Sequence, residues 1–365
     1  MSNSSKLPTD PKDFEDAQES KKDLKKGNPH RIVMWILIIV ALLVGVGFLT
    51  ITPYMVNGSE KEVTVRIPKN ATMENVSDTL HKYFPEDYSN KVLRLLDITG
   101  FDPVERHGLY VLPVGATPFA TMRKIARGSQ TPVRITFNGF RSLDTLIERI
   151  ALKMEFTPDQ LKAALNNPEL MAKYGLTPDQ ALALFLEDTY EIYWTASPEE
   201  LIQKIGDNYN GFWSEGKKAL AEDMDLKPSD VMIIASIVDE ESNQALEKGR
   251  IGRLYINRLD KNMKLQADPT VRFALNDFTI NRVTNEHLKV NSPYNTYLHE
   301  GLPPGPIRTT SRETVNAILN SKPSSDIFMC AREDFSGFHN FAPTYEEHLE
   351  NAKRYQNELD RRGIK

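Results

Sequence analysis

An uninterrupted apolar segment near the N-terminus constrains this chain of 365 residues more than any other feature. Residues 32–51 read IVMWILIIVALLVGVGFLTI and carry no charged side chain. A helix needs about 20 consecutive apolar residues to cross the hydrocarbon core of a bilayer. The sequence therefore predicts a transmembrane helix over residues 32–52, with the rest of the chain folding in water.

The charges beside this segment predict its orientation. Its C-terminal flank is balanced in charge, whereas its N-terminal flank is basic, through Lys21, Lys22, Lys25, Lys26 and Arg31. The positive-inside rule then places the N-terminus in the cytoplasm and the chain from about Tyr54 onward outside it. The apolar core is longer than that of a cleaved signal peptide, so we expect a permanent anchor. Residues 1–31 contain few aliphatic side chains and are predicted to form a disordered cytoplasmic tail.

Composition excludes several classes of function. The formal net charge is −5 and no basic run follows the anchor, so nucleic acid is not an expected partner. Cys330 is the single cysteine, which excludes an internal disulfide and a cysteine-based zinc site. The zinc-protease, P-loop and dinucleotide-binding patterns do not occur. We therefore expect neither a metal nor a cofactor.

The part after the anchor divides into two α+β regions. Residues 60–138 predict a small module in the order strand, helix, helix, strand, with Thr72 as a helix cap and a further β-rich segment at 133–137. The segment 108–125 resembles a LysM-like glycan-binding module, and a plain spacer domain is the alternative. Residues 139–365 predict a larger, helix-rich α+β catalytic domain. Its helix starts are marked by a proline after Thr157, Thr177, Ser197 and Lys227.

One of these helices ends on a candidate catalytic acid. At 3.6 residues per turn, Ile234, Val238 and Glu241 share an apolar face, whereas Asp239 and Glu240 should turn toward water. A carboxyl group set against apolar side chains has a raised pKa and holds a proton near neutral pH. Glu241 is therefore a candidate general acid. The alternative is that it merely ends a core helix and points into solvent.

Three later segments carry candidate substrate-binding residues. Carboxylate, amide and hydroxyl groups, together with flat aromatic faces, are suited to sugars. They are provided by Gln266, Asp268 and Thr270 in the predicted turn 265–271, by Tyr294, Asn295, Thr296 and Tyr297, and by His339. The alternatives are a turn in which Asp268 bonds its own backbone, ordinary packing of the two tyrosines, and a structural histidine.

Taken in order, these motifs resemble the MltG-type endolytic murein transglycosylases, also called the YceG-like family. The resemblance rests on ASIVDEES at 235–242, YINRL at 255–259, LQADPT at 265–270, SPYNTY at 292–297 with GLPPGPI at 301–307, and FHNF at 338–341. The family's catalytic Glu is the second acid of a Glu-x-Glu-Thr sequence, which matches Glu241. Departures are Asp239 for Glu, Ser242 for Thr, Glu187 for Pro, Phe338 for Gly and Leu349 for Asn.

The resemblance implies a lyase of the bacterial inner membrane that acts on peptidoglycan glycan strands. Glu241 would protonate the β-1,4 bond between N-acetylmuramic acid and N-acetylglucosamine, and the muramic C6 hydroxyl would close onto C1 as a 1,6-anhydro end. Peptidoglycan synthases and division proteins are the candidate protein partners. Two alternatives stay open: a hydrolase that uses Asp268 or Asp239 as a second carboxylate, and a membrane-anchored scaffold that binds glycan without cleaving it.

Overall fold

The computed structural model describes residues 29–55, 58–280 and 282–363. Contacts group the chain into two compact units, the first reaching to residue 129 and the second running from residue 130, with residues 107–109 grouped with the second. Each unit mixes helices with a small amount of sheet, as the α+β prediction requires. The predicted disordered tail lies outside the described residues, except for its last three residues, which start helix α2.

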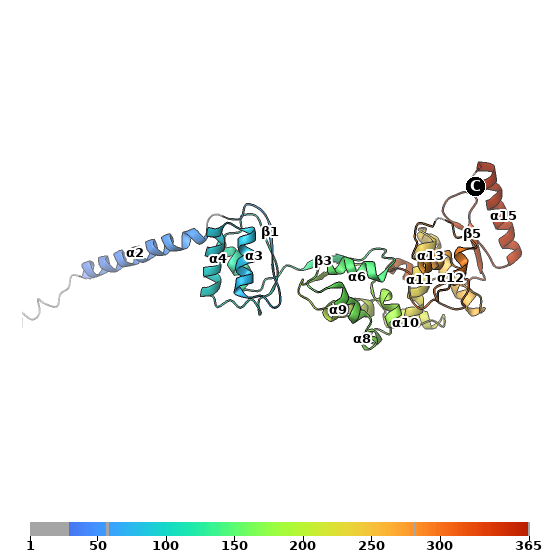
Figure 1. Cartoon of the computed structure of the whole chain (residues 1–365), viewed down its shortest axis with the longest axis horizontal. Helices are drawn as coiled ribbons and strands as arrows, with labels where there is room; N and C mark the ends of the chain where they lie inside the picture. The colour runs from blue at the N-terminus through green and yellow to red at the C-terminus, as the bar shows by residue number, and fades with distance from the viewer. Residues whose placement is uncertain (1–28, 56–57, 281, 364–365) are drawn as a thin grey trace, which may run out of the picture. The chain divides into compact units, whose positions relative to one another are not determined.

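The predicted anchor forms one continuous helix, α2 (Pro29–Met55). Its most apolar window of 18 residues has a mean hydropathy of 3.0, and none of that window is buried against the rest of the protein. Figure 1 shows α2 as a straight helix that precedes β1. A helix of this length and apolarity is compatible with a membrane anchor.

The first unit continues with the predicted order of strand, helix, helix and strand. Its elements are β1 (Val63–Ile67), α3 (Met73–Tyr83), α4 (Glu86–Ile98), β2 (Gly108–Leu112) and α5 (Pro118–Ala126). Thr72 caps α3 as predicted. Its hydroxyl accepts from the Asn75 backbone amide, and the Asn75 side-chain oxygen accepts from the Thr72 backbone amide. β1 and β2 pair as a two-stranded sheet. The core of the first unit contains Val65, Leu80, Val92, Leu96 and Tyr110.

The strand predicted at 133–137 does not belong to the first unit. β3 (Val133–Thr136) pairs antiparallel with β4 (Thr189–Ile192), which lies in the second unit. The boundary predicted at residue 138 therefore falls nearer residue 130. The sequence pattern identified the strand, but its partner is more than 50 residues away and leaves no local signal.

Helices dominate the first half of the second unit (Figure 1). Prolines occupy the first turn where predicted, and Thr157 and Ser197 each form a reciprocal capping box. The segment after Thr177 is a 3₁₀ helix rather than an α-helix. The elements are α6 (Leu143–Ala151), α7 (Pro158–Leu165), α8 (Pro168–Ala172), η1 (Pro178–Leu184), α9 (Pro198–Phe212) and α10 (Glu215–Glu222).

Helix α11 (Pro228–Glu241) is the centre of the second unit, since every residue from Val231 to Asp239 is buried. α12 (Ala245–Asp260) and α14 (Arg312–Leu319) pack on it and on each other. They approach closely at Gly252, where a Cβ atom would lie 2.5 Å from the Ile318 side chain. The remaining elements here are α13 (Asp268–Leu275) and η2 (His287–Lys289).

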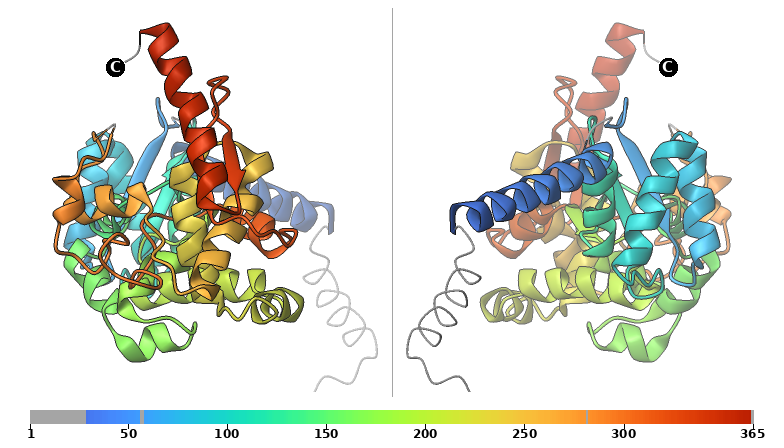
Figure 2. Two further views of the ribbon diagram at one scale, coloured as in Figure 1. Left: turned by 90° about the vertical axis from the view of Figure 1, so that its right-hand side faces the viewer. Right: turned by 90° about the vertical axis from the view of Figure 1, so that its left-hand side faces the viewer.

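The C-terminal part is a hairpin backed by a helix. β5 (Phe328–Ala331) pairs antiparallel with β6 (His339–Ala342), with Ala331 opposite His339. α15 (Tyr345–Arg362) lies along this hairpin (Figure 2). The hairpin therefore carries His339 into the second unit on a short, rigid element.

Candidate active site

Glu241 is the last residue of α11 and lines a pocket of about 240 Å³ in the second unit. Four of the predicted binding residues line the same pocket: Gln266, Asp268, Tyr297 and His339. They come from three separate segments, namely the residues that lead into α13, the loop before residue 300, and β6. The fold thus brings together side chains that lie up to 98 positions apart in the chain.

The surroundings of Glu241 favour its neutral form. Tyr255 in α12 donates a hydrogen bond of 2.7 Å from its hydroxyl to Glu241 Oε1. Burial raises the pKa of the Glu241 carboxyl, and this effect exceeds the opposing hydrogen bond from Tyr255. The negative charge of Asp268 raises that pKa further, whereas His339 and Arg272 lower it. The raised pKa favours the protonated carboxyl, which is the form that can donate a proton.

Asp268 is the second carboxylate of the pocket. It is the first residue of α13, where a negative charge is favoured by the helix dipole. The Tyr297 hydroxyl donates a hydrogen bond of 2.6 Å to Asp268 Oδ1. Burial and this bond together raise the pKa of Tyr297, so its hydroxyl stays protonated as the donor. The two acids of the pocket therefore each accept from one tyrosine.

Arg258 holds the wall of the pocket together. Its buried guanidinium donates to the carbonyl of Ile327 at 2.6 Å and to those of Lys264 and Leu265 at 3.2 and 2.7 Å. It also reaches the side-chain oxygen of Gln266 at 3.4 Å. Gln266 has a φ of 51°, a conformation that is costly for a residue with a Cβ. Because several arginine bonds end on this segment, we infer that they help to hold it in that shape.

His339 is fixed by a buried acid that the sequence analysis did not identify. Glu247 in α12 accepts from the His339 backbone amide at 2.9 Å and contacts the His339 ring nitrogen Nδ1 at 2.8 Å. Ser242, directly after Glu241, donates to the same carboxylate at 2.6 Å. Glu247 therefore ties the end of α11 to the hairpin that carries His339.

The other four predicted binding residues do not line this pocket. Thr270, Asn295 and Thr296 are fully buried. The hydroxyls of Thr270 and Thr296 lie 2.8 Å apart, and the Asn295 amide donates to the carbonyls of Leu288 and Val290 at 2.9 Å. Tyr294 packs on Phe273 with ring centroids 4.6 Å apart. These side chains position the loop that presents Tyr297.

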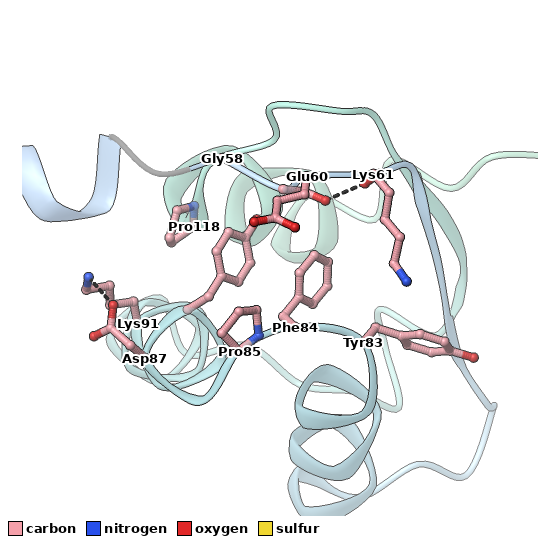
Figure 3. Close-up of a pocket in the computed structure, with 11 residues that line it drawn as sticks. Gly58, Glu60, Lys61, Tyr83, Phe84, Pro85, Asp87, Lys91 and Pro118 are labelled. Carbon is pink, nitrogen blue, oxygen red and sulfur yellow. Dashed lines mark hydrogen bonds and ion pairs between the residues drawn. The ribbon is translucent and has the colours of Figure 1, made fainter.

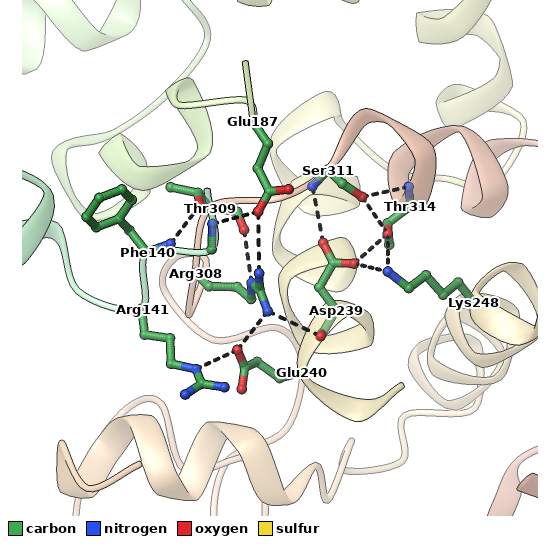
Figure 4. A network of polar contacts seen from close by, with 11 residues as sticks. Phe140, Arg141, Glu187, Asp239, Glu240, Lys248, Arg308, Thr309, Ser311 and Thr314 are labelled. Carbon is green, nitrogen blue, oxygen red and sulfur yellow. Dashed lines mark hydrogen bonds and ion pairs between the residues drawn. The ribbon is translucent and has the colours of Figure 1, made fainter. Parts of the chain in front are cut away.

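Asp239 and Glu240 do not turn toward water, so that prediction was wrong. Their side chains are 4% and 7% exposed. Asp239 pairs with Lys248 at 2.6 Å and accepts from the Ser311 amide at 3.2 Å. Figure 4 shows Arg308 in the middle of a network that includes both acids.

Arg308 joins three segments in this network. It donates to Glu240 at 3.0 Å and to the Asp239 carbonyl at 3.3 Å, and it lies 3.4 Å from Glu187. Arg141 adds a bond of 2.8 Å to Glu240. Glu187, which departs from the family pattern, also accepts from the Gly139 amide at 2.7 Å. The network thus holds the end of α11 in place through Asp239 and Glu240, the two residues before Glu241.

Three other side chains that line the pocket were not predicted from the sequence, namely Tyr255, Arg258 and Arg272. Tyr255 and Arg258 both lie in the YINRL motif, but no role was assigned to either side chain from the sequence. Their spacing of three positions, which puts both on one helix face, was the available signal. Arg272 follows Asp268 by four positions, and once a helix starts at Asp268 that spacing places both on one face as well.

The model of the YceG-like family matches residues 65–354, so the chain belongs to that family. The match includes part of each unit and every residue of the pocket described above.

Two curated relatives carry the name endolytic murein transglycosylase. The protein of Bacillus subtilis (strain 168) is 33% identical over 125 residues, which are 34% of this chain and 34% of that protein. The protein of Streptococcus pneumoniae serotype 2 (strain D39 / NCTC 7466) is 23% identical over 339 residues, which are 82% of this chain and 59% of that protein. The chain therefore spans less than two thirds of the length of either relative.

A solved structure supports the fold. The crystal structure of a YceG-like protein, lmo1499 from Listeria monocytogenes, superposes with a TM-score of 0.53 at 23% sequence identity. The match covers 80% of this chain and 99% of the Listeria chain.

The raised pKa of Glu241 predicts a pH dependence of stability. Above the ordinary carboxyl value of 4.5, the folded chain holds a proton that the unfolded chain has released, so the free energy of unfolding falls as pH rises through the folded pKa. Glu241→Gln carries no such proton. We expect this variant to be more stable than the wild type at neutral pH, with the difference disappearing below the ordinary carboxyl value.

Thermal unfolding of the full chain in detergent, followed from acid to neutral pH, measures this difference. Glu222→Gln, an exposed change at the end of α10, is the matched control and should run parallel to the wild type. Parallel curves for Glu241→Gln and the wild type over the whole range would show that Glu241 is not held neutral by the fold.

Proposed function

We propose that this protein is an endolytic lytic transglycosylase of peptidoglycan, and therefore a lyase. The observation that carries the proposal is the position of Glu241, a carboxyl group with a raised pKa, in a polar pocket of a chain that belongs to the YceG-like family. The names of the curated relatives add support, since both describe transglycosylases of murein. The substrate would be the β-1,4 bond between N-acetylmuramic acid and N-acetylglucosamine.

In the proposed reaction one carboxyl group serves both steps. Protonated Glu241 donates its proton to the glycosidic oxygen as the bond to the muramic C1 breaks, and that proton leaves on the glucosamine hydroxyl. The Glu241 carboxylate then takes the proton of the muramic C6 hydroxyl, whose oxygen bonds to C1. The acid is restored, no water is consumed, and the new end is a 1,6-anhydro sugar.

The pocket provides what this cycle needs. Tyr255 donates to Glu241 and stabilises the carboxylate that forms between the two proton transfers. Arg258 and Arg272 add positive charge in the same pocket, which also favours that carboxylate. We propose Gln266, Asp268, Tyr297 and His339 as the residues that contact the sugar rings. Thr270, Tyr294, Asn295 and Thr296 would support this surface from behind.

Glu241→Gln tests the proposal directly. The amide cannot donate or accept the required proton, so we expect cleavage of purified glycan strands to fall by about a hundredfold to ten-thousandfold. The measurement is mass spectrometry of strands digested by the full chain in detergent. Wild type should release internal 1,6-anhydromuramic ends, and Glu222→Gln should match it.

Two outcomes would contradict the transglycosylase. Reducing ends in place of anhydro ends would indicate a hydrolase, with Asp268 as the second carboxylate, because Asp268 shares the pocket whereas Asp239 is held in the network around Arg308. No cleavage by a folded wild-type chain that still binds strands would indicate a glycan-binding scaffold.

We also propose that α2 anchors the protein in the bacterial inner membrane with residue 1 on the cytoplasmic side. The support is its apolar length and the five basic residues within positions 21–31. In a Cys330→Ser background, a cysteine in place of the exposed Ile98 should react with a membrane-impermeant maleimide in intact cells. A cysteine in place of Ser5 should react only after lysis, and the reverse pattern would invert the orientation.

For the first unit we propose a LysM-like module that contacts glycan. It holds a pocket of about 370 Å³ at the turn between α3 and α4, lined by Tyr83, Phe84 and Tyr88 (Figure 3). Phe84 and Tyr88 are buried and stack on each other at 4.5 Å, whereas Tyr83 is 37% exposed. The exposed face of Tyr83 suits a sugar ring.

Tyr83→Ala should weaken binding of glycan strands to the full chain by about fivefold, for a stacking contact of about 1 kcal/mol. The measurement is equilibrium binding of labelled strands in a Glu241→Gln background. Ile98→Ala, an exposed apolar change in the same unit, is the control. Unchanged binding in both variants would assign the first unit to spacing.

A glycan cleaver held at the membrane would meet strands as they are made. We therefore propose peptidoglycan synthases and division proteins as its partners, which crosslinking in growing cells followed by mass spectrometry would test. A crosslinked set that contains neither class would contradict this proposal.

A further inference from the structure

The active-site pocket contains two arginines in opposite situations. Arg258 is buried and its donors are used, by three backbone carbonyls and the Gln266 side chain. Arg272 lines the same pocket from α13, yet its side chain makes no hydrogen bond or ion pair with any residue of the described segments 29–55, 58–280 and 282–363. Its Nε is buried and has no acceptor.

Neither acid of the pocket forms an ion pair with the Arg272 guanidinium. Asp268 lies four positions earlier on α13, a spacing that commonly gives an ion pair, but its Oδ1 accepts from Tyr297 instead. Glu241 accepts from Tyr255, and its raised pKa favours the neutral form. Arg272 lowers the pKa of Glu241 only as the smallest of the influences on it.

A guanidinium is always charged and presents its donors in a planar fork that matches a carboxylate. Leaving a buried donor without an acceptor is costly, so native proteins rarely do it without a reason. In a pocket open to a substrate, the reason can be that the acceptor arrives with the ligand. The unused fork of Arg272 therefore marks a place for an anion beside the proposed acid.

We propose that Arg272 recognises a carboxylate carried by the muramic acid residue of the strand. This inference rests on the proposed function, which supplies the class of substrate. The carboxylate has two chemical sources. It is the lactyl group itself when the strand is stripped of peptides, or an acidic group of the stem peptide when the lactyl group is in amide linkage. Either source would orient the muramic ring against Glu241, which makes Arg272 a residue of substrate specificity rather than of proton transfer.

The test measures binding of end-labelled strands to the full chain in detergent, in a Glu241→Gln background so that no strand is cut. Four substrates are compared: strands with stem peptides, strands freed of them, and each of these two with its carboxyl groups converted to amides. Arg272→Gln should weaken binding about tenfold on the substrate that carries the recognised carboxylate and should leave binding of the amidated strands unchanged.

Controls separate recognition from folding. Arg272→Lys keeps the charge but loses the fork, so its loss of affinity should be smaller. Arg149→Gln removes an exposed positive charge from α6 and should bind every substrate as the parent does. Melting temperatures of all variants are compared with that of the parent, and a variant that does not fold is replaced by Arg272→Lys in the comparison.

The outcomes are distinct. A loss confined to peptide-bearing strands assigns the carboxylate to the stem, and a loss confined to stripped strands assigns it to the lactyl group. Equal losses on amidated and unmodified strands, or no loss on any strand, would overturn the inference. Cleavage by the chain with native Glu241 is measured in parallel, so a wild type that binds but does not cut refutes the proposed reaction and leaves carboxylate recognition to be judged by the binding data.

Discussion

The arrangement at the end of α11 depends on how three consecutive acids are neutralised. A helix C-terminus carries a partial negative charge, so Asp239, Glu240 and Glu241 stand where carboxylates are disfavoured. Lys248 pairs with the first and Arg308 and Arg141 with the second. The Lys248–Asp239 and Arg308–Glu240 pairs are largely buried, and removing one partner from such a pair costs about 3–5 kcal/mol, so these two contacts fix the helix end firmly.

Glu241 is the one acid of the three that forms no ion pair with a cation among the described residues, and its raised pKa follows from that difference. Its partner is a neutral hydroxyl, that of Tyr255, rather than a cation held at bonding distance. Burial then raises the pKa of the Glu241 carboxyl instead of being offset by an ion pair. Ion pairs hold the two neighbouring acids in place, whereas Glu241, bonded to a hydroxyl, has a raised pKa that favours its protonated form.

Local sequence patterns predicted much of the fold. The features that they did not predict depend on contacts between residues far apart in the sequence. The proline-marked helix starts, the Thr72 cap and the phase of Glu241 were all readable, because each depends on residues within about one turn. The burial of Asp239 was not, since Ser311 and Thr314 lie more than 70 positions away. The partner of β3 was missed for the same reason.

The predicted binding residues divide in a similar way. They were predicted from side-chain type, and type does not reveal which way a side chain points. Tyr297 and Asp268 reach the pocket, whereas Asn295 donates to two carbonyls of its own loop and the Thr296 hydroxyl accepts from the Ala267 amide. Arg258 and Arg272 were overlooked because a positive charge on a helix usually faces solvent.

The pocket is assembled from residues that span positions 241 to 339, and its last wall is the hairpin held by Glu247. Synthesis runs from the N-terminus, so the pocket residues from Glu241 to Tyr297 are made before this hairpin. The pocket thus stays incomplete until His339 has been made, even if α11 and α12 fold earlier. The order of residues along the chain makes the hairpin the last wall to be added.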